Sequence, residues 1–166
     1  DKGYEKGTLN ERLIKDWKPK ILKQIIQEYR AILKNNNLEE GKNYLSVEIA
    51  KKLTQKFLDL EKKEILKAKQ NGEQLTIKGL EDDLSGSIQL NNTTFNLTGR
   101  VDRVDELGDV LRIIDYKTGK VEEGEVTFFN WDELSENNKK GKAFQLLMYA
   151  YLYLNKNPQY LDRKVI

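Results

Sequence analysis

The spacing of hydrophobic residues changes once along the chain and divides it into two parts. An apolar stripe with the period of an amphipathic helix runs over residues 21–33, and a second covers residues 49–66. The second stripe is followed by Asn71-Gly72, a common way for a helix to end. We therefore predict that residues 1–72 form a helical part.

Polar residues and one proline predict where these helices begin and break. Thr8 and Glu11 have the spacing of a capping box, which predicts a helix start. Pro19 predicts a break or the first turn of a new helix. Ser46 is expected to cap the second long helix.

For residues 73–166 we predict a sheet and a following helix, and the candidate site residues described below lie in this part. Residues 87–90 and 94–97 flank Asn91-Asn92, a plausible hairpin turn, and a second turn is expected at residues 107–109. The pattern predicts an antiparallel meander of three or four strands framed by helices. The fold class is therefore α+β, with a mixed or antiparallel central sheet.

After the predicted sheet, the sequence becomes irregular and then strongly apolar. Residues 121–142 form an irregular excursion that carries Phe128, Phe129 and Trp131. These aromatic side chains either stack on nucleic-acid bases or pack over the sheet, and packing is the commoner use. Residues 144–154 are apolar almost all round, as expected for a helix packed on a sheet.

The absence of cysteine and histidine limits the chemistry that this chain can perform. Disulfides, thiolate or imidazole metal sites and histidine-dependent nucleophiles are excluded. Carboxylates, lysine and tyrosine remain, and oxygen ligands favour Mg²⁺ or Mn²⁺. No apolar run is long enough to cross a membrane, so we expect a soluble, cytoplasmic protein without membrane contacts.

Charge is unevenly distributed, although the net charge is only +2. Residues 1–70 hold 17 lysines and arginines against 11 acidic residues, whereas the remaining residues hold 12 against 16. A basic helical part beside an acidic part suits a phosphodiester substrate. Two solvated helix faces would explain the lysines equally well.

Two neighbouring strands are expected to bring charged residues together. Strand alternation places Asp115 and Lys117 on one face and Tyr116 on the other, and Asp102 arrives from the adjacent strand. A carboxylate beside the apolar strand that precedes Asp115 needs a partner, for which a hydrated divalent cation is a good candidate. A surface ion pair is the simpler alternative for Asp-x-Lys.

The order of these motifs resembles the PD-(D/E)XK nuclease superfamily, in particular its RecB/AddB-like (PDDEXK_1-type) branch. Gly-x-x-Asp-Arg-x-Asp begins at Gly99, Ile-Asp-Tyr-Lys-Thr-Gly-Lys contains Asp115, and a helical Gln-x-x-x-Tyr follows. The resemblance covers residues 74–154 and implies a restriction-endonuclease-like core. It implies the following roles: metal ligation by Asp102, Asp115 and the Tyr116 carbonyl, and catalytic or adjacent positions for Asp102, Asp115, Lys117, Gln145 and Tyr149.

The resemblance also implies a function. We expect a deoxyribonuclease dependent on Mg²⁺ or Mn²⁺, an exonuclease in DNA repair or recombination, with DNA and a helicase-like module or subunit as partners. Such nucleases usually carry a further histidine or glutamate on a helix ahead of the sheet, whereas this chain has no histidine and is expected to begin after the place of that helix. At the other end, residues 163–166 resemble a strand just beginning. We therefore expect residues 1–166 to be one nuclease-like domain within a larger protein. Two alternatives remain: an inactive or incomplete nuclease fold that binds DNA or acts as a scaffold, and a carboxylate site for a structural cation.

Overall fold

The computed structural model describes residues 7–33 and 38–166 of the chain. They have an α+β fold and divide into two compact units, a helical unit over residues 8–75 and a sheet unit that contains residues 76–166. In the described ranges, no helix combines the length and the apolar character that spanning a bilayer requires.

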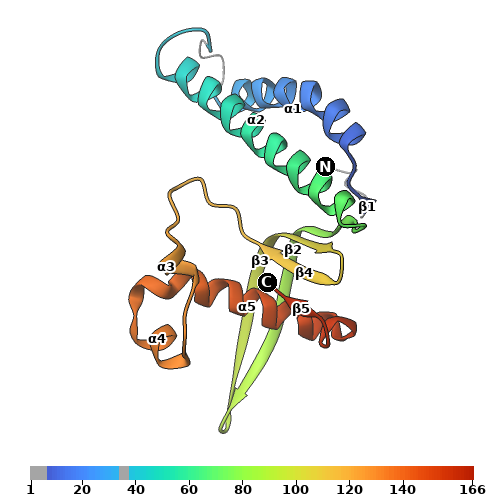
Figure 1. The fold of residues 1–166 in the computed structure, drawn as a ribbon. Helices are drawn as coiled ribbons and strands as arrows, with labels where there is room; N and C mark the ends of the chain where they lie inside the picture. Colours follow the sequence, from blue (N-terminus) through green and yellow to red (C-terminus); the bar gives the residue numbers. More distant parts are fainter. Residues whose placement is uncertain (1–6, 34–37) are drawn as a thin grey trace. The chain divides into compact units, whose positions relative to one another are not determined.

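The helical unit is a hairpin of α1 (Glu11–Ile32) and α2 (Gly41–Gln70), which pack against each other (Figure 1). The cap of α1 is Asn10, whose side chain accepts a hydrogen bond from the Leu13 amide at 3.0 Å. Pro19 lies inside α1, so the predicted break is wrong. Proline removes one helical hydrogen bond, and the packing of α1 against α2 can offset that loss.

The start of α2 also differs from the prediction, whereas its end agrees with it. Glu40 precedes the first turn, and Ser46 lies inside the helix rather than at its cap. Asn71 caps the C-terminus, and Gly72 has a φ of +74°, a conformation that glycine adopts without a steric penalty. The predicted stop at Asn71-Gly72 is confirmed.

The sheet consists of β1 (Gly7–Thr8), β2 (Leu75–Leu90), β3 (Thr93–Leu107), β4 (Val110–Ile114) and β5 (Lys164–Val165), in this order. It is mixed, because β3 and β4 pair antiparallel whereas β4 and β5 pair parallel. The predicted turns are confirmed at Asn91 and Gly108, with φ values of 52° and 59°. The outer strand β5 coincides with the strand expected at residues 163–166, whereas β1 has only two residues, too few to produce an alternating pattern.

The core of the sheet unit lies between the sheet and α5 (Gly141–Lys156), which packs on β3 and β4 (Figure 1). Val104 and Ile113 are partners in the antiparallel register and therefore face the same side. Asp102, two residues before Val104, shares that side by strand alternation. The buried cluster consists of Leu84, Val101, Val104, Leu111, Ile113, Leu152 and Tyr153.

Short helices occupy the excursion between β4 and α5: α3 (Glu123–Val126), α4 (Trp131–Glu136) and η1 (Asn138–Lys140). A further short helix, η2 (Pro158–Tyr160), follows α5. Phe128 is half-buried, and its ring lies 5.7 Å from that of Trp131. Phe129 and Trp131 are 94% and 72% exposed, so the expectation that they pack over the sheet is wrong for these two.

Candidate active site

The first component of the site is the segment that follows β4. This strand ends at Ile114, and the next three residues continue without regular secondary structure. Lys117 Nζ forms an ion pair with Asp115 Oδ2, and the Asp115 side chain is only 10% exposed. The predicted placement of these two side chains on one side is confirmed.

Asp102 joins this pair from β3. Its Oδ2 accepts a hydrogen bond from the backbone amide of Tyr116 at 2.6 Å. The hydrogen bond to Asp115 raises the pKa of Lys117 above its ordinary 10.5, burial lowers that pKa, and the charges of Tyr149 and Asp102 raise it further. The three charged groups therefore lie within electrostatic range of one another, as the sequence predicts.

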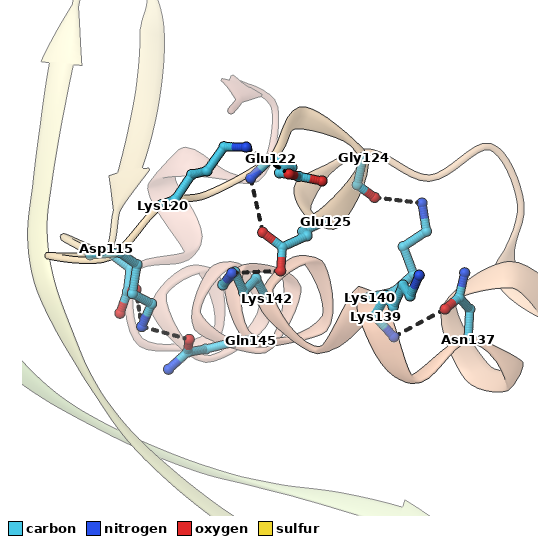
Figure 2. Close-up of polar contacts among 11 residues, drawn as sticks. Asp115, Lys120, Glu122, Gly124, Glu125, Asn137, Lys139, Lys140, Lys142 and Gln145 are labelled. Atoms are coloured by element: carbon cyan, nitrogen blue, oxygen red, sulfur yellow. Dashed lines mark hydrogen bonds and ion pairs between the residues drawn. The ribbon is translucent and has the colours of Figure 1, made fainter.

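The helix α5 adds two polar side chains one turn apart. Gln145 Oε1 accepts a hydrogen bond from Lys117 Nζ at 3.2 Å, and Gln145 Nε2 donates to Tyr149 Oη at 2.8 Å. Figure 2 shows Gln145 on α5 facing the segment that carries Asp115. The structure therefore connects the side chains of Asp115, Lys117, Gln145 and Tyr149, and Asp102 contacts the backbone amide between the first two.

Gly99 provides the space in which Tyr149 lies. A Cβ atom at this position would approach Tyr149 Cε1 to 2.8 Å and Cδ1 to 3.2 Å, closer than carbon atoms normally pack. The sequence shows Gly99 as the first residue of its motif but gives no reason for it. The reason is the close approach of the Tyr149 ring to the β3 backbone.

The opposite face of the same strands holds a buried charged network that the sequence did not reveal as such. Asp105 is fully buried and accepts hydrogen bonds from Arg103 Nε at 2.6 Å and from Arg112 Nε at 2.6 Å. Arg103 Nη1 also donates to the phenol oxygen of Tyr116 at 3.2 Å. The sequence feature that could have revealed this network is the presence of charged residues at alternating positions within otherwise apolar strands.

The donor set at the site fits a hard divalent cation. Asp102 accepts from the Tyr116 amide with Oδ2, and Asp115 pairs with Lys117 through Oδ2, so Oδ1 of each carboxylate is available as a metal ligand. Residues 7–33 and 38–166 contain no cluster of three or more acidic, histidine or cysteine residues that could hold a metal ion. Two carboxylates are nevertheless sufficient for Mg²⁺, which keeps several waters and often takes further ligands from a substrate phosphate. Ligation by the Tyr116 carbonyl stays a prediction.

Comparison with curated proteins and with solved structures gave no significant match. A family model described as the PD-(D/E)XK nuclease superfamily matches residues 5–164, nearly the whole chain. The fold agrees with the restriction-endonuclease-like core implied by the motifs, whereas the RecB/AddB-like branch stays a prediction. The chain therefore belongs to the PD-(D/E)XK nuclease superfamily.

Proposed function

We propose that this protein is a metal-dependent deoxyribonuclease that hydrolyses phosphodiester bonds at the site formed by β3, the segment after β4, and α5. The observation that carries the proposal is the convergence of Asp102, Asp115 and Lys117, with Lys117 also hydrogen-bonded to Gln145. Two carboxylates beside a positively charged amine suit a reaction in which negative charge accumulates on a phosphate.

The two carboxylates and the Tyr116 carbonyl would hold Mg²⁺ or Mn²⁺. When bound, such an ion lowers the pKa of a coordinated water and polarises a phosphate oxygen. Lys117 would orient the attacking water or help to deprotonate it, and its positive charge would offset the charge that develops on the phosphate. The segment after β4 would thus contribute two metal ligands, from Asp115 and Tyr116, and the positively charged Lys117, so its conformation should control activity.

Gln145 and Tyr149 are proposed to hold Lys117 in place. The Gln145 carbonyl oxygen accepts from Lys117 while its amide nitrogen donates to Tyr149, so these contacts define the orientation of the amide. Restricting the lysine in this way reduces the entropy lost when substrate binds. Both residues belong to α5, a regular element that can hold them rigidly.

The resemblance to RecB/AddB-like nucleases supports further proposals. We infer an exonuclease that acts in DNA repair or recombination, in association with a helicase-like module or subunit. A site that contacts phosphate and sugar reads little sequence, so cleavage should be nearly independent of base composition. DNA binding through phosphates should also weaken as salt concentration rises.

Cleavage of end-labelled single- and double-stranded DNA, in separate reactions with Mg²⁺ and Mn²⁺, tests this function. The variants Asp115→Ala and Lys117→Ala should reduce the rate by roughly 10²- to 10⁴-fold, the range of a positioned acid–base or charge-stabilising group. Lys120→Ala is the matched control, because Lys120 is an exposed lysine of the same segment that pairs with Glu122. Equal cleavage by the parent and both site variants would exclude this site as the nuclease centre.

One observation favours an alternative, an inactive or incomplete nuclease fold that binds DNA. The described residues hold only two carboxylates at the site and no cluster of three potential metal ligands. This alternative predicts salt-dependent DNA binding without metal-dependent cleavage by the parent protein. Binding measured by fluorescence anisotropy, with cleavage followed in the same samples, distinguishes the two functions.

A further inference from the structure

The segment that carries Asp115 and Lys117 lies beyond the paired part of its strand. The antiparallel register between β3 and β4 ends with the pair Arg103↔Ile114, and the three residues after Ile114 are outside β4. Ladder hydrogen bonds to β3 therefore do not define their conformation. Segments of this kind are more mobile than strands, so a precise site requires other contacts.

Tyr116 provides two such contacts. Its backbone amide donates to Asp102 Oδ2 at 2.6 Å, and its phenol oxygen accepts from Arg103 Nη1 at 3.2 Å. Asp102 and Arg103 are consecutive on β3 and therefore point to opposite faces of the sheet. Two neighbouring strand residues thus hold the same tyrosine, one through its backbone and the other through its side chain.

Arg103 is itself held firmly. Its side chain is 3% exposed, and both Nε and Nη2 lie 2.6 Å from Asp105 Oδ2. Arg112 binds the same carboxylate with Nε on Oδ1 at 2.6 Å and Nη2 on Oδ2 at 3.0 Å, a two-point contact with defined geometry. The register pairs Asp105 with Arg112, so the network is built on paired strand residues.

Burial of this network does not by itself indicate a gain in stability. The cost of removing charges from water often equals or exceeds their mutual attraction, and apolar residues of similar volume can be as stable. The network instead fixes the orientation of a hydrogen-bond donor, because the planar guanidinium of Arg103 presents Nη1 to the Tyr116 phenol at a defined position. This points to a role in the geometry of the adjacent site.

We propose that the phenol of Tyr116, held by Arg103, is a positioning group that fixes the peptide between Asp115 and Lys117 from the opposite face of the sheet. The catalytic consequence rests on the proposed nuclease function, whereas the effect on the peptide does not. Removal of the phenol oxygen should leave the fold intact and loosen the Tyr116 amide from Asp102.

The test compares Tyr116→Phe with Tyr151→Phe. Tyr151 is the matched control, because it is also partly exposed and its phenol donates one hydrogen bond, to the Ser87 carbonyl oxygen at 3.2 Å. Hydrogen exchange is measured without metal or DNA. In Tyr116→Phe, protection of the amide of residue 116 should fall by about tenfold, the effect of losing one hydrogen bond, while the urea midpoint stays unchanged.

Kinetics on DNA provide the second readout. In Tyr116→Phe, kcat should fall by roughly 10- to 100-fold with KM for DNA unchanged, as is usual when a group that orients a ligand is lost. Arg103→Lys also alters the contacts with Asp105, so kcat should fall at least as far. The double variant should be no worse than Arg103→Lys alone, because that variant has already lost the contact with the Tyr116 phenol. Tyr151→Phe should retain the parental kcat.

The outcomes separate this inference from the proposed function. Parental amide protection in Tyr116→Phe overturns the positioning role, whether or not the protein cleaves DNA. Reduced protection with no cleavage by the parent protein supports the positioning role and contradicts the nuclease function. Reduced protection with an unchanged kcat in a cleaving parent shows that the contact does not serve catalysis, which also overturns the proposal.

Discussion

Asp105 is the carboxylate that pairs with the two arginines of the buried charged network. It is fully buried between two guanidinium groups, so its removal would leave Arg103 and Arg112 facing each other without the shared carboxylate. Asp105→Ala should therefore lower the free energy of unfolding by about 3–5 kcal/mol, the cost of breaking a buried ion pair from one side. Urea denaturation measures the loss, with Asp109→Ala as the control.

Asp109 is a suitable control because it is fully exposed in the turn between β3 and β4. Its replacement should change stability by less than about 0.5 kcal/mol, as for most surface substitutions. Equal effects of the two variants would show that the carboxylate of Asp105 is not the centre of a buried network.

At Gly99 the site adjoins the core, because a Cβ atom there would meet both Tyr149 and the core residue Leu152. A methyl group here would have to displace the Tyr149 ring, to which it would approach within 2.8 Å. Gly99→Ala should cost about 1–3 kcal/mol of stability, the usual cost of overpacking, and should also reduce cleavage by shifting Tyr149 away from Gln145. Gly119→Ala is the control, because a Cβ atom there would meet nothing within 4 Å.

Thermal unfolding and DNA cleavage measured on both glycine variants distinguish the two effects. A stable Gly99→Ala variant with parental cleavage would contradict the steric argument. If only stability falls, the Tyr149 ring is part of the core but not of the site.

At the scale of elements, local signals predicted turns well and helix boundaries less well. The turns at Asn91 and Gly108 were predictable because residues with positive φ come from a small set of amino acids. The predictions made from Pro19 and Ser46 were wrong, because both residues lie inside helices that pack against each other. This packing stabilises the helices by more than the local preferences of the two residues disfavour them, and the sequence does not show it.

The approach of Asp102 to Asp115 and Lys117 was expected from the pairing of neighbouring strands, although these two residues lie just beyond the end of β4. The place of Gln145 and Tyr149 beside them was expected only from the family resemblance, because it depends on the packing of α5 against the sheet.

The excursion between β4 and α5 could not be predicted, because its organisation depends on one buried lysine. Lys140 Nζ donates to the carbonyl oxygens of Gly124 at 2.8 Å and Thr127 at 2.7 Å and lies 2.6 Å from a Glu133 carboxylate oxygen. Figure 2 shows Lys140 reaching the Gly124 carbonyl. These partners are 7 to 16 positions away in sequence, and no local pattern relates them.

Lys140→Met should therefore loosen α3 and α4 while α5 persists. The variant leaves two carbonyl oxygens and one carboxylate without their shared donor, and each unsatisfied group costs about 1–3 kcal/mol. Hydrogen exchange should accelerate in residues 123–136, whereas the core of β3 should remain protected. Lys139→Met is the control because Lys139 is exposed; identical exchange in both variants would contradict the role of Lys140.

For the whole molecule, the absence of histidine and cysteine defines how stability depends on pH. No side chain of the described residues has an ordinary pKa between pH 6 and 8, so the free energy of unfolding should be nearly constant across that range. Urea midpoints measured at unit intervals of pH check this. A slope in that range would require a strongly shifted carboxylate or lysine.

Above pH 9, a buried tyrosine should make the stability of the molecule fall. Burial raises the pKa of Tyr153 from 10.0 to about 12, so the unfolded chain loses this proton at lower pH than the folded chain. Between these values the unfolded state binds fewer protons, and stability decreases as pH rises, by roughly 1.4 kcal/mol per pKa unit of difference. Tyr153→Phe should have a shallower loss of urea midpoint between pH 10 and 12 than Tyr151→Phe, whose tyrosine is partly exposed. Parallel curves for the two variants would show that the Tyr153 phenol ionises as readily in the folded chain as in the unfolded one.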